Sequence, residues 1–221
     1  MLARLEPIRN WIFDLDNTLY PASARLFEQI DRKMGAYIAD RFGCDLVEAR
    51  RIQKGYFHGH GTTLAGLMAE HQVDPHQFLD FVHDIEMDVL EENLPLAAAI
   101  AKLPGRKIVF TNADTPYAGR VLDRLGLGAS FEAIHDIHAM DLKPKPQESA
   151  YAGLCAAFGI DPAESLFVED MARNLKPAKA IGMTTVWVDN GSEQTPDMDR
   201  SYIDFTTHDL RHWLEEILEK A

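Results

Sequence analysis

Short apolar runs recur along the chain, separated by stretches in which apolar residues have helical spacing. The clearest runs occupy residues 11–13, 107–110, 132–134, 166–168 and 184–188, and a weaker candidate spans 202–205. Their brevity and their β-branched and aromatic content are typical of strands buried on both faces of a parallel sheet. Strands alternating with helices predict an α/β fold with a Rossmann-like, three-layer core and right-handed crossovers.

One interval breaks this alternation. Roughly 90 residues separate the first run from the second, whereas a simple crossover needs about 30. Its first part carries an apolar face at helical spacing that a glycine ends: Leu26, Ile30, Met34, Ile38, Phe42 and Gly43. We therefore expect a core formed by residues 1–19 and 92–221, and a helical cap domain inserted at 20–91. A cap that leaves the sheet after the first strand should cover the edge where open α/β sheets bind ligands.

The later helices are also legible. Residues 115–128 and 147–160 have helical spacing, and the second stretch should end at Gly159. Residues 172–182 predict a shorter helix, with Pro177 in its first turns or between two pieces. The tail from 209 to 220 predicts a final amphipathic helix.

Charge and cysteine content exclude several classes of partner. The formal net charge is -13, and no basic stripe suggests a nucleic-acid or anionic-membrane surface. An anionic ligand would therefore need a bound cation and a few placed lysines. Cys44 and Cys155 have no close partner, which argues against a disulfide framework or a cysteine zinc site. Without a signal-peptide pattern or an apolar stretch of about 18 residues, we expect a cytoplasmic protein that does not enter a membrane.

Polar residues follow three of the expected strands. The sequence DLDNT (14–18) follows the first run, TN (111–112) the second and ED (169–170) the fourth, while LKPKP (142–146) precedes the fourth. Carboxyl ends of parallel strands meet at one edge, so these clusters should meet there. Side chains two apart on an extended chain point to one side, so Asp14 and Asp16 should face the same ligand. Taken alone, DLD is more often a solvated turn.

This motif set resembles the haloacid dehalogenase superfamily, whose phosphatases carry DxDxT, then Ser or Thr, then Lys, then a paired acidic motif. The resemblance covers nearly the whole chain. The segments FHGHGTTLAGLMAEH (57–71), KIVFTNAD (107–114) and FVEDMARNL (167–175) are further similar to the pyrimidine 5'-nucleotidase-like branch.

The resemblance implies a two-step phosphoryl transfer. Asp14 would attack phosphorus to form an aspartyl-phosphate, and Asp16 would protonate the leaving oxygen and then activate water. Mg²⁺ would be held by Asp14, the Asp16 backbone carbonyl and Asp170, with Glu169 beside it. A like charge raises the pKa of one carboxyl of a pair, and a metal favours the ionised form of its ligand.

Three further positions follow from the motifs. Thr111 and the Asn112 backbone amide would donate to phosphate oxygens, although Thr111 could equally be a helix N-cap. Lys143 is preferred over Lys145 as the phosphate-screening lysine, because the family lysine precedes a proline in a KPxP pattern. Asn174 stands where related enzymes often have another acid, and it could hold a metal-bound water.

The cap sequence is less informative. His58 and His60 diverge by about 200° on a helix and cannot share one ion, and His135 and His138 lack a surrounding ligand framework. The stretch around Phe57, His60 and Thr62 suits a nucleobase pocket, but it is equally a helix junction.

The resemblance to the superfamily therefore implies a Mg²⁺-dependent phosphomonoesterase that acts on a small phosphorylated metabolite. The finer resemblance to the pyrimidine 5'-nucleotidase-like branch implies a nucleotide such as UMP or CMP. The alternatives are a phosphatase for phosphoglycolate or a sugar phosphate, a β-phosphoglucomutase-like enzyme, and a non-catalytic binding module. A dehalogenase would need neither Asp16 nor a divalent metal. The sequence leaves the oligomeric state open.

Overall fold

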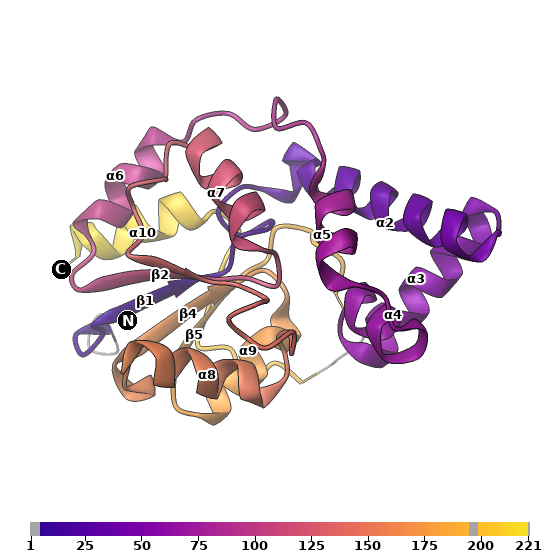
Figure 1. The fold of residues 1–221 in the computed structure, drawn as a ribbon. Coiled ribbons are helices and arrows are strands. Elements are labelled where there is room, and N and C mark those ends of the chain that lie inside the picture. Colours follow the sequence, from indigo (N-terminus) through magenta and orange to yellow (C-terminus); the bar gives the residue numbers. More distant parts are fainter. Residues whose placement is uncertain (1–4, 195–198, 221) are drawn as a thin grey trace.

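A six-stranded parallel sheet forms the centre of the molecule (Figure 1). The computed structural model describes residues 5–194 and 199–220, so the outermost residues of the expected core, 1–4 and 221, lie outside it. The strands run in the order β3-β2-β1-β4-β5-β6, and every neighbouring pair is parallel. Their bounds are β1 Asn10–Phe13, β2 Arg106–Phe110, β3 Ala133–His135, β4 Ser165–Glu169, β5 Thr184–Val188 and β6 Phe205–Thr207. The predicted α/β class is confirmed.

The central strands are buried as the apolar runs predict. Every residue of β1 and β4 is buried, and Ile12 pairs with Ile108 on one side and with Phe167 on the other. Gly105 fixes where β2 starts, because its φ is +79° and an added Cβ would lie 2.1 Å from the Arg9 carbonyl oxygen. Only glycine tolerates both conditions, and the amide that follows it donates to that same carbonyl at 2.8 Å.

The last strand differs from the expected 202–205. Residues 202–204 are held by a side chain of β5, since the Thr185 hydroxyl donates to the Tyr202 carbonyl at 2.6 Å and accepts from the Asp204 amide at 3.0 Å. The Asp204 carboxylate accepts from the Thr185 amide at 3.0 Å. These side-chain bonds delay regular pairing until Phe205, which pairs with Val186.

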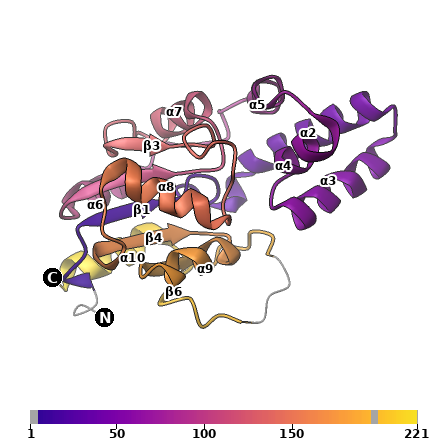
Figure 2. The same cartoon turned by 60° about the horizontal axis from the view of Figure 1, so that its bottom comes forward.

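Helices cover both faces of the sheet. On one face lie α6 (Leu94–Lys102), α7 (Thr115–Arg124) and α10 (Leu210–Glu219), and on the other α8 (Glu148–Phe158) and α9 (Ala172–Ala180) (Figures 1 and 2). A short 3₁₀ turn, η2 (Pro162–Glu164), leads into β4. Gly159 ends α8 in the left-handed conformation, as predicted. Pro177 lies inside α9, which is a single helix rather than two pieces.

The long interval between β1 and β2 forms a group of helices on one side of the sheet, beyond the carboxyl end of β1 (Figures 1 and 2). After the short turn η1 (Ala22–Ala24) come α2 (Leu26–Phe42), α3 (Leu46–His60), α4 (Thr63–His71) and α5 (Pro75–His83). Gly43 ends α2 in the left-handed conformation. Gly66 lets α4 approach α3, because an added Cβ would lie 2.4 Å from the Tyr56 ring.

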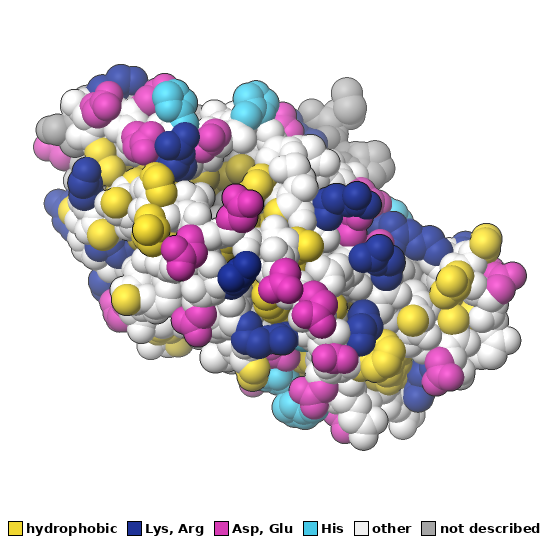
Figure 3. All heavy atoms as spheres, turned by 90° about the horizontal axis from the view of Figure 1, so that it is seen from above, with side chains coloured by type: hydrophobic (Ala, Val, Ile, Leu, Met, Phe, Trp, Pro, Cys, Tyr) yellow, Lys and Arg dark blue, Asp and Glu magenta, His cyan; other side chains and the backbone are white. Residues whose placement is uncertain are grey.

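Charged side chains of both signs lie on the face of the molecule that Figure 3 shows. On the face in Figure 3, acidic and basic side chains are interspersed rather than separated into patches. In the described ranges, no helix is both long enough and apolar enough to cross a lipid bilayer. Cys44 and Cys155 are free thiols.

Candidate active site

The chain turns sharply where β1 ends. The Asp14 amide still donates to the Val168 carbonyl of β4 at 2.9 Å, but the amides of Thr18 and Leu19 both fold back onto the Leu15 carbonyl. Asn17 takes a φ of 60°, a conformation that asparagine tolerates better than most residues. Asp14 and Asp16 do line one cavity, as predicted. The reason is different, however, because Asp16 lies in this turn and not on an extended strand.

Lys145 carries the positive charge of the site. Its Nζ donates to Asp14 Oδ1 at 2.7 Å, to Glu169 Oε2 at 2.8 Å and to the Phe110 carbonyl at 2.7 Å. The side chain is 1% exposed, and the Phe110 and Phe167 rings lie beside the ammonium. All three ammonium protons are therefore used, and the cation is fixed between the ends of β1, β2 and β4.

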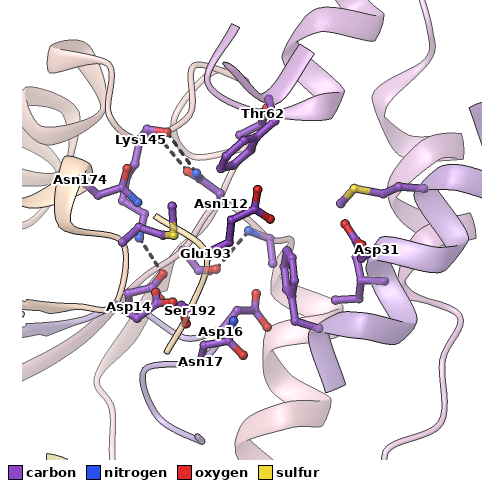
Figure 4. Close-up of a pocket in the computed structure, with 18 of the residues that line it drawn as sticks. Asp14, Asp16, Asn17, Asp31, Thr62, Asn112, Lys145, Asn174, Ser192 and Glu193 are labelled. Carbon is purple, nitrogen blue, oxygen red and sulfur yellow. Dashed lines mark hydrogen bonds and ion pairs between the residues drawn. The ribbon is translucent and has the colours of Figure 1, made fainter. Parts of the chain in front are cut away.

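The prediction that Lys143, rather than Lys145, is the phosphate-screening lysine is wrong. Lys143 is exposed and does not line the cavity. The physical reason is a clamp by Asn112, whose side chain accepts from the Lys145 amide at 2.8 Å and donates to the Lys145 carbonyl at 3.2 Å (Figure 4). This pair of bonds fixes the backbone of Lys145, and not that of Lys143, against the end of β2.

Two acidic residues after β4 complete the cluster. One carboxylate oxygen from each of Asp14, Glu169 and Asp170 lies within 4.8 Å of the other two, and all three residues are buried. The Thr18 hydroxyl donates to Asp14 Oδ2 at 3.0 Å and accepts from the Asp170 amide at 3.1 Å. The threonine of the DxDxT motif thus joins the β1 turn to the β4 end.

Buried carboxyl groups outnumber buried ammonium groups in this cluster of described residues. Burial and the neighbouring Glu169 raise the pKa of Asp14 to about 7, despite the opposing pull of Lys145. Burial, Glu169 and Asp14 raise the pKa of Asp170 well above its usual value. Burial acts to lower the pKa of Lys145, but the two contacting carboxylates raise it overall. One ammonium thus faces several carboxyl groups, which suits an additional cation.

The donor set fits Mg²⁺. Hard carboxylate oxygens are the ligands that Mg²⁺ prefers. Glu169 accepts from three described donors, namely Lys145, Asn174 Nδ2 at 3.1 Å and the Met171 amide at 3.1 Å, whereas Asp14 accepts from two, Lys145 and Thr18. Asp14 and Asp170 therefore keep more free lone pairs for the ion. Asn174 Oδ1 is buried and has no hydrogen-bond partner among the described residues. An orphaned acceptor at the edge of an acidic cluster is the position expected for a residue that bonds a metal-bound water.

Thr111 and Asn112, the motif residues that follow β2, also line the cavity. Thr111 is buried, and its hydroxyl accepts from the Ala113 amide at 3.0 Å. None of the described residues accepts the proton of this hydroxyl, which remains available to a ligand. Thr111 is not the N-cap of α7, because Asp114 fills that position by accepting from the Tyr117 amide. The side chain of Asn112 clamps Lys145, a role that the sequence did not reveal.

The cavity has a volume of about 640 Å³ and extends from the acidic cluster to the helices after β1. Figure 4 shows Asp14 and Lys145 on one side and Asp31 of α2 on the other. Phe57 and Thr62 line it, although Thr62 also caps α4 by accepting from the Ala65 amide at 3.1 Å. His60 does not line it, and instead pairs with Glu70 at 2.9 Å.

Among the described residues, His135 and His138 lie in separate ring contacts rather than in one cluster. His138 stacks on His76 at 4.6 Å, whereas His135 is buried between the Phe110 and Phe158 rings. In the described part of the chain, the cluster of Asp14, Glu169 and Asp170 is the one group with metal-ligand spacing.

Several residues near the site were not predicted. Tyr20 and Tyr117 bond to Asp16, Arg173 contacts the Phe57 ring at 4.1 Å, and Glu193 pairs with Lys54. Glu193 lies in the loop after β5, at the same edge as the other clusters, so the strand-end rule could have found it. The tyrosines carried no such signal, because a tyrosine in a helical pattern is usually a core residue.

The chain is similar in sequence to a yeast protein. This relative, phosphate metabolism protein 8 of Saccharomyces cerevisiae, is 26% identical over 196 residues, which cover 80% of this chain and 61% of the yeast protein. The chain therefore spans less than two thirds of that relative's length.

Solved structures share the fold. A haloacid dehalogenase (HAD) phosphatase from Thermococcus onnurineus superposes with a TM-score of 0.63 at 17% identity, covering 96% of this chain and 98% of that one. The magnesium-bound putative hydrolase YfnB of Bacillus subtilis gives 0.61 at 13% identity, with 95% and 98% covered. The L-2-haloacid dehalogenase of Xanthobacter autotrophicus gives 0.56 at 19% identity, with 97% and 100% covered. The family model for haloacid dehalogenase-like hydrolases matches residues 8–182, and the chain belongs to that family.

Proposed function

We propose that the protein is a Mg²⁺-dependent phosphomonoesterase that acts through an aspartyl-phosphate at Asp14. The observation that carries this proposal is one buried arrangement: Asp14 bonded to Lys145, with Asp170 beside it and Asp16 opening into the same cavity. Mg²⁺, when bound, would neutralise the carboxylates and polarise the phosphate. Lys145 would orient Asp14, and Thr111 would donate to a phosphate oxygen.

Asp16 distinguishes this proposal from dehalogenation. A halide leaves as a stable anion and takes no proton, whereas an alkoxide leaving from phosphorus needs an acid. Burial raises the pKa of the Asp16 carboxyl, which favours its protonated form before the reaction. Asp16 would give this proton to the leaving oxygen and later accept one from water.

A pyrimidine nucleoside 5'-monophosphate, UMP or CMP, is the substrate we favour. The cavity volume of about 640 Å³ is within the range for ligands of this size, whereas phosphoglycolate would leave most of it empty. Aromatic and aliphatic side chains from the inserted helices would contact the base: Phe27, Ile30, Met34, Phe57 and Phe78. The ion pair of Asp31 with Arg50 adds an acceptor and donors to that wall. In this proposal residues 20–91 act as the cap that excludes water.

A panel of phosphate monoesters tests the proposal. UMP, CMP, AMP, phosphoglycolate and several sugar phosphates are incubated with the protein, and phosphate release is measured with Mg²⁺ and with EDTA. We expect Mg²⁺-dependent release, highest kcat/KM for UMP or CMP, and no release by Asp14→Asn protein. Conversion of β-glucose 1-phosphate to glucose 6-phosphate would favour the mutase alternative, and inactivity across the panel would favour a binding module.

The free thiols suit the cytoplasm, where we propose that the reaction occurs.

A further inference from the structure

The Asp16 carboxyl group is held by two tyrosines. The hydroxyls of Tyr20 and Tyr117 both lie 2.6 Å from the same oxygen, Asp16 Oδ1. Tyr20 follows the β1 turn and Tyr117 lies in the first turn of α7, so the two phenols come from separate segments of the chain. Both are at most 2% exposed.

We propose that Tyr20 and Tyr117 are positioning residues that reserve Oδ1 as an acceptor and so confine the acidic proton of Asp16 to Oδ2, the oxygen that serves the leaving group. This inference rests on the proposed phosphatase function.

The hydrogen-bond inventory supports this assignment. A phenol ordinarily keeps its proton near neutral pH, so both hydroxyls can donate to Oδ1 across their 2.6 Å contacts. Two donated bonds occupy both lone pairs of Oδ1, and a proton on neutral Asp16 must then sit on Oδ2. No described side chain or amide donates to Oδ2, which leaves it for the ligand.

The Tyr117 ring is itself held in place by the inserted helices. It stacks on His83, the last residue of α5, with ring centroids 4.3 Å apart and an interplanar angle of 15°. His83 Nδ1 lies 3.2 Å from Asp114 Oδ2, and Asp114 Oδ1 accepts from the Tyr117 amide at 2.9 Å. The phenol therefore reaches Asp16 from a position fixed at both its ring and its backbone.

The reaction uses the two oxygens of Asp16 differently. A carboxylate oxygen of Asp14 forms a bond to phosphorus as the ester P–O bond breaks, and the electron pair of that bond goes to the leaving oxygen. The leaving oxygen takes the proton from Asp16 Oδ2. The resulting Asp16 carboxylate keeps its two phenol bonds at Oδ1, and Oδ2 then accepts a proton from the water that attacks phosphorus and releases Asp14.

The test compares two leaving groups. Tyr20→Phe and Tyr117→Phe are assayed with UMP, whose alkoxide needs a proton, and with p-nitrophenyl phosphate, whose phenolate leaves as a stable anion. The ratio kcat/KM is used because it reports only the steps up to release of the alcohol, and not the later attack by water. If the wild type does not hydrolyse UMP, the alkyl phosphate of the panel that it hydrolyses fastest replaces UMP.

We expect each variant to lose about 10- to 100-fold in kcat/KM with the alkyl phosphate, since a positioned acid contributes roughly 10²- to 10⁴-fold. The loss with p-nitrophenyl phosphate should stay below about threefold on the same reasoning. In the Asp16→Asn background, Tyr117→Phe should cause no further loss, because the phenol acts through Asp16. Tyr202→Phe is the matched control, since it removes a buried phenol oxygen that bonds only Arg200 among the described residues.

Equal losses with both substrates, unchanged kcat/KM, or additive losses with Asp16→Asn would overturn the proposal. A variant too unstable to assay also counts against it, because its hydroxyl would then serve folding. A wild type that releases phosphate from neither substrate would refute the proposed function, and this inference with it.

Discussion

Replacing Lys145 with methionine tests the electrostatic core of the site. The change removes an ammonium that contacts Asp14, Glu169 and the Phe110 carbonyl, and it retains most of the aliphatic volume. Lys143→Met is the matched control, because the same substitution occurs two residues away at an exposed position.

The expected loss of stability is large. Removing one partner of a buried ion pair costs about 3–5 kcal/mol, because the remaining charge is left uncompensated. For a chain of this length, each kcal/mol corresponds to roughly 2–4 °C in Tm, so Tm should fall by about 6–20 °C. Lys143→Met should change the free energy of unfolding by less than about 0.5 kcal/mol.

The loss of stability in Lys145→Met protein should also depend on pH. The pKa of Asp14 is raised to about 7, and loss of Lys145 raises it further, so the folded state binds more protons than the unfolded state. Stability then falls as pH rises from the unfolded pKa near 4 through the folded value, and the deficit of Lys145→Met should be greater at pH 8 than at pH 6.

Urea denaturation and thermal melting in EDTA measure these differences, and phosphate release in Mg²⁺ measures activity. Lys145→Met is expected to lose activity while Lys143→Met keeps it. If the two variants are equally stable and equally active, or if Lys143→Met is the impaired one, the assignment of the buried cation is refuted.

Three further outcomes follow from the structure. Mg²⁺ should stabilise the wild type by about 2.7 kcal/mol at 100 times its Kd. The Mg²⁺-induced shift in Tm should grow from pH 5 to pH 8, because protons compete with the ion for Asp14 and Asp170, whose pKa values are raised. Asp170→Asn protein is the control and should show no shift in Tm. Burial lowers the pKa of His135 below 6.5, so His135 contributes a loss of stability as pH falls from 6.5 toward the folded value, opposite in sign to the contribution of Asp14. His135→Gln should remove this contribution in denaturant titrations, and a pH dependence identical to that of the wild type would contradict the assignment. Gly105→Ala should cost about 2 kcal/mol or more in unfolding free energy through its positive φ and the Arg9 carbonyl contact, whereas Gly119→Ala, which meets no atom within 4 Å in α7, should be neutral or stabilising.

The sheet could be predicted because its strands are buried on both faces. Such strands are short continuous apolar runs, and β1 and β4 are fully buried. The sixth strand was misplaced because Thr185 and Asp204 use side-chain bonds to hold residues 202–204, and hydrophobic periodicity does not report such bonds. The long helical interval was legible from its length and from Gly43.

Motif spacing located the acidic cluster but not the lysine. The sequence contains two lysines in LKPKP, and only the tertiary clamp by Asn112 decides which one enters the core. The bonds from Tyr20 and Tyr117 to Asp16 were invisible for a similar reason. They depend on where α7 begins relative to the β1 turn, which is set by packing across the sheet edge.

Trapping a covalent intermediate tests the central claim most directly. Wild-type protein is mixed with a radioactively phosphate-labelled substrate that it hydrolyses in Mg²⁺, quenched in acid during turnover and digested. We predict label on the peptide that contains Asp14, loss of that label in hydroxylamine as expected for an acyl phosphate, and no label on Asp14→Asn protein. Turnover without covalent label, or label of the same amount on the Asp14→Asn variant, would contradict the account.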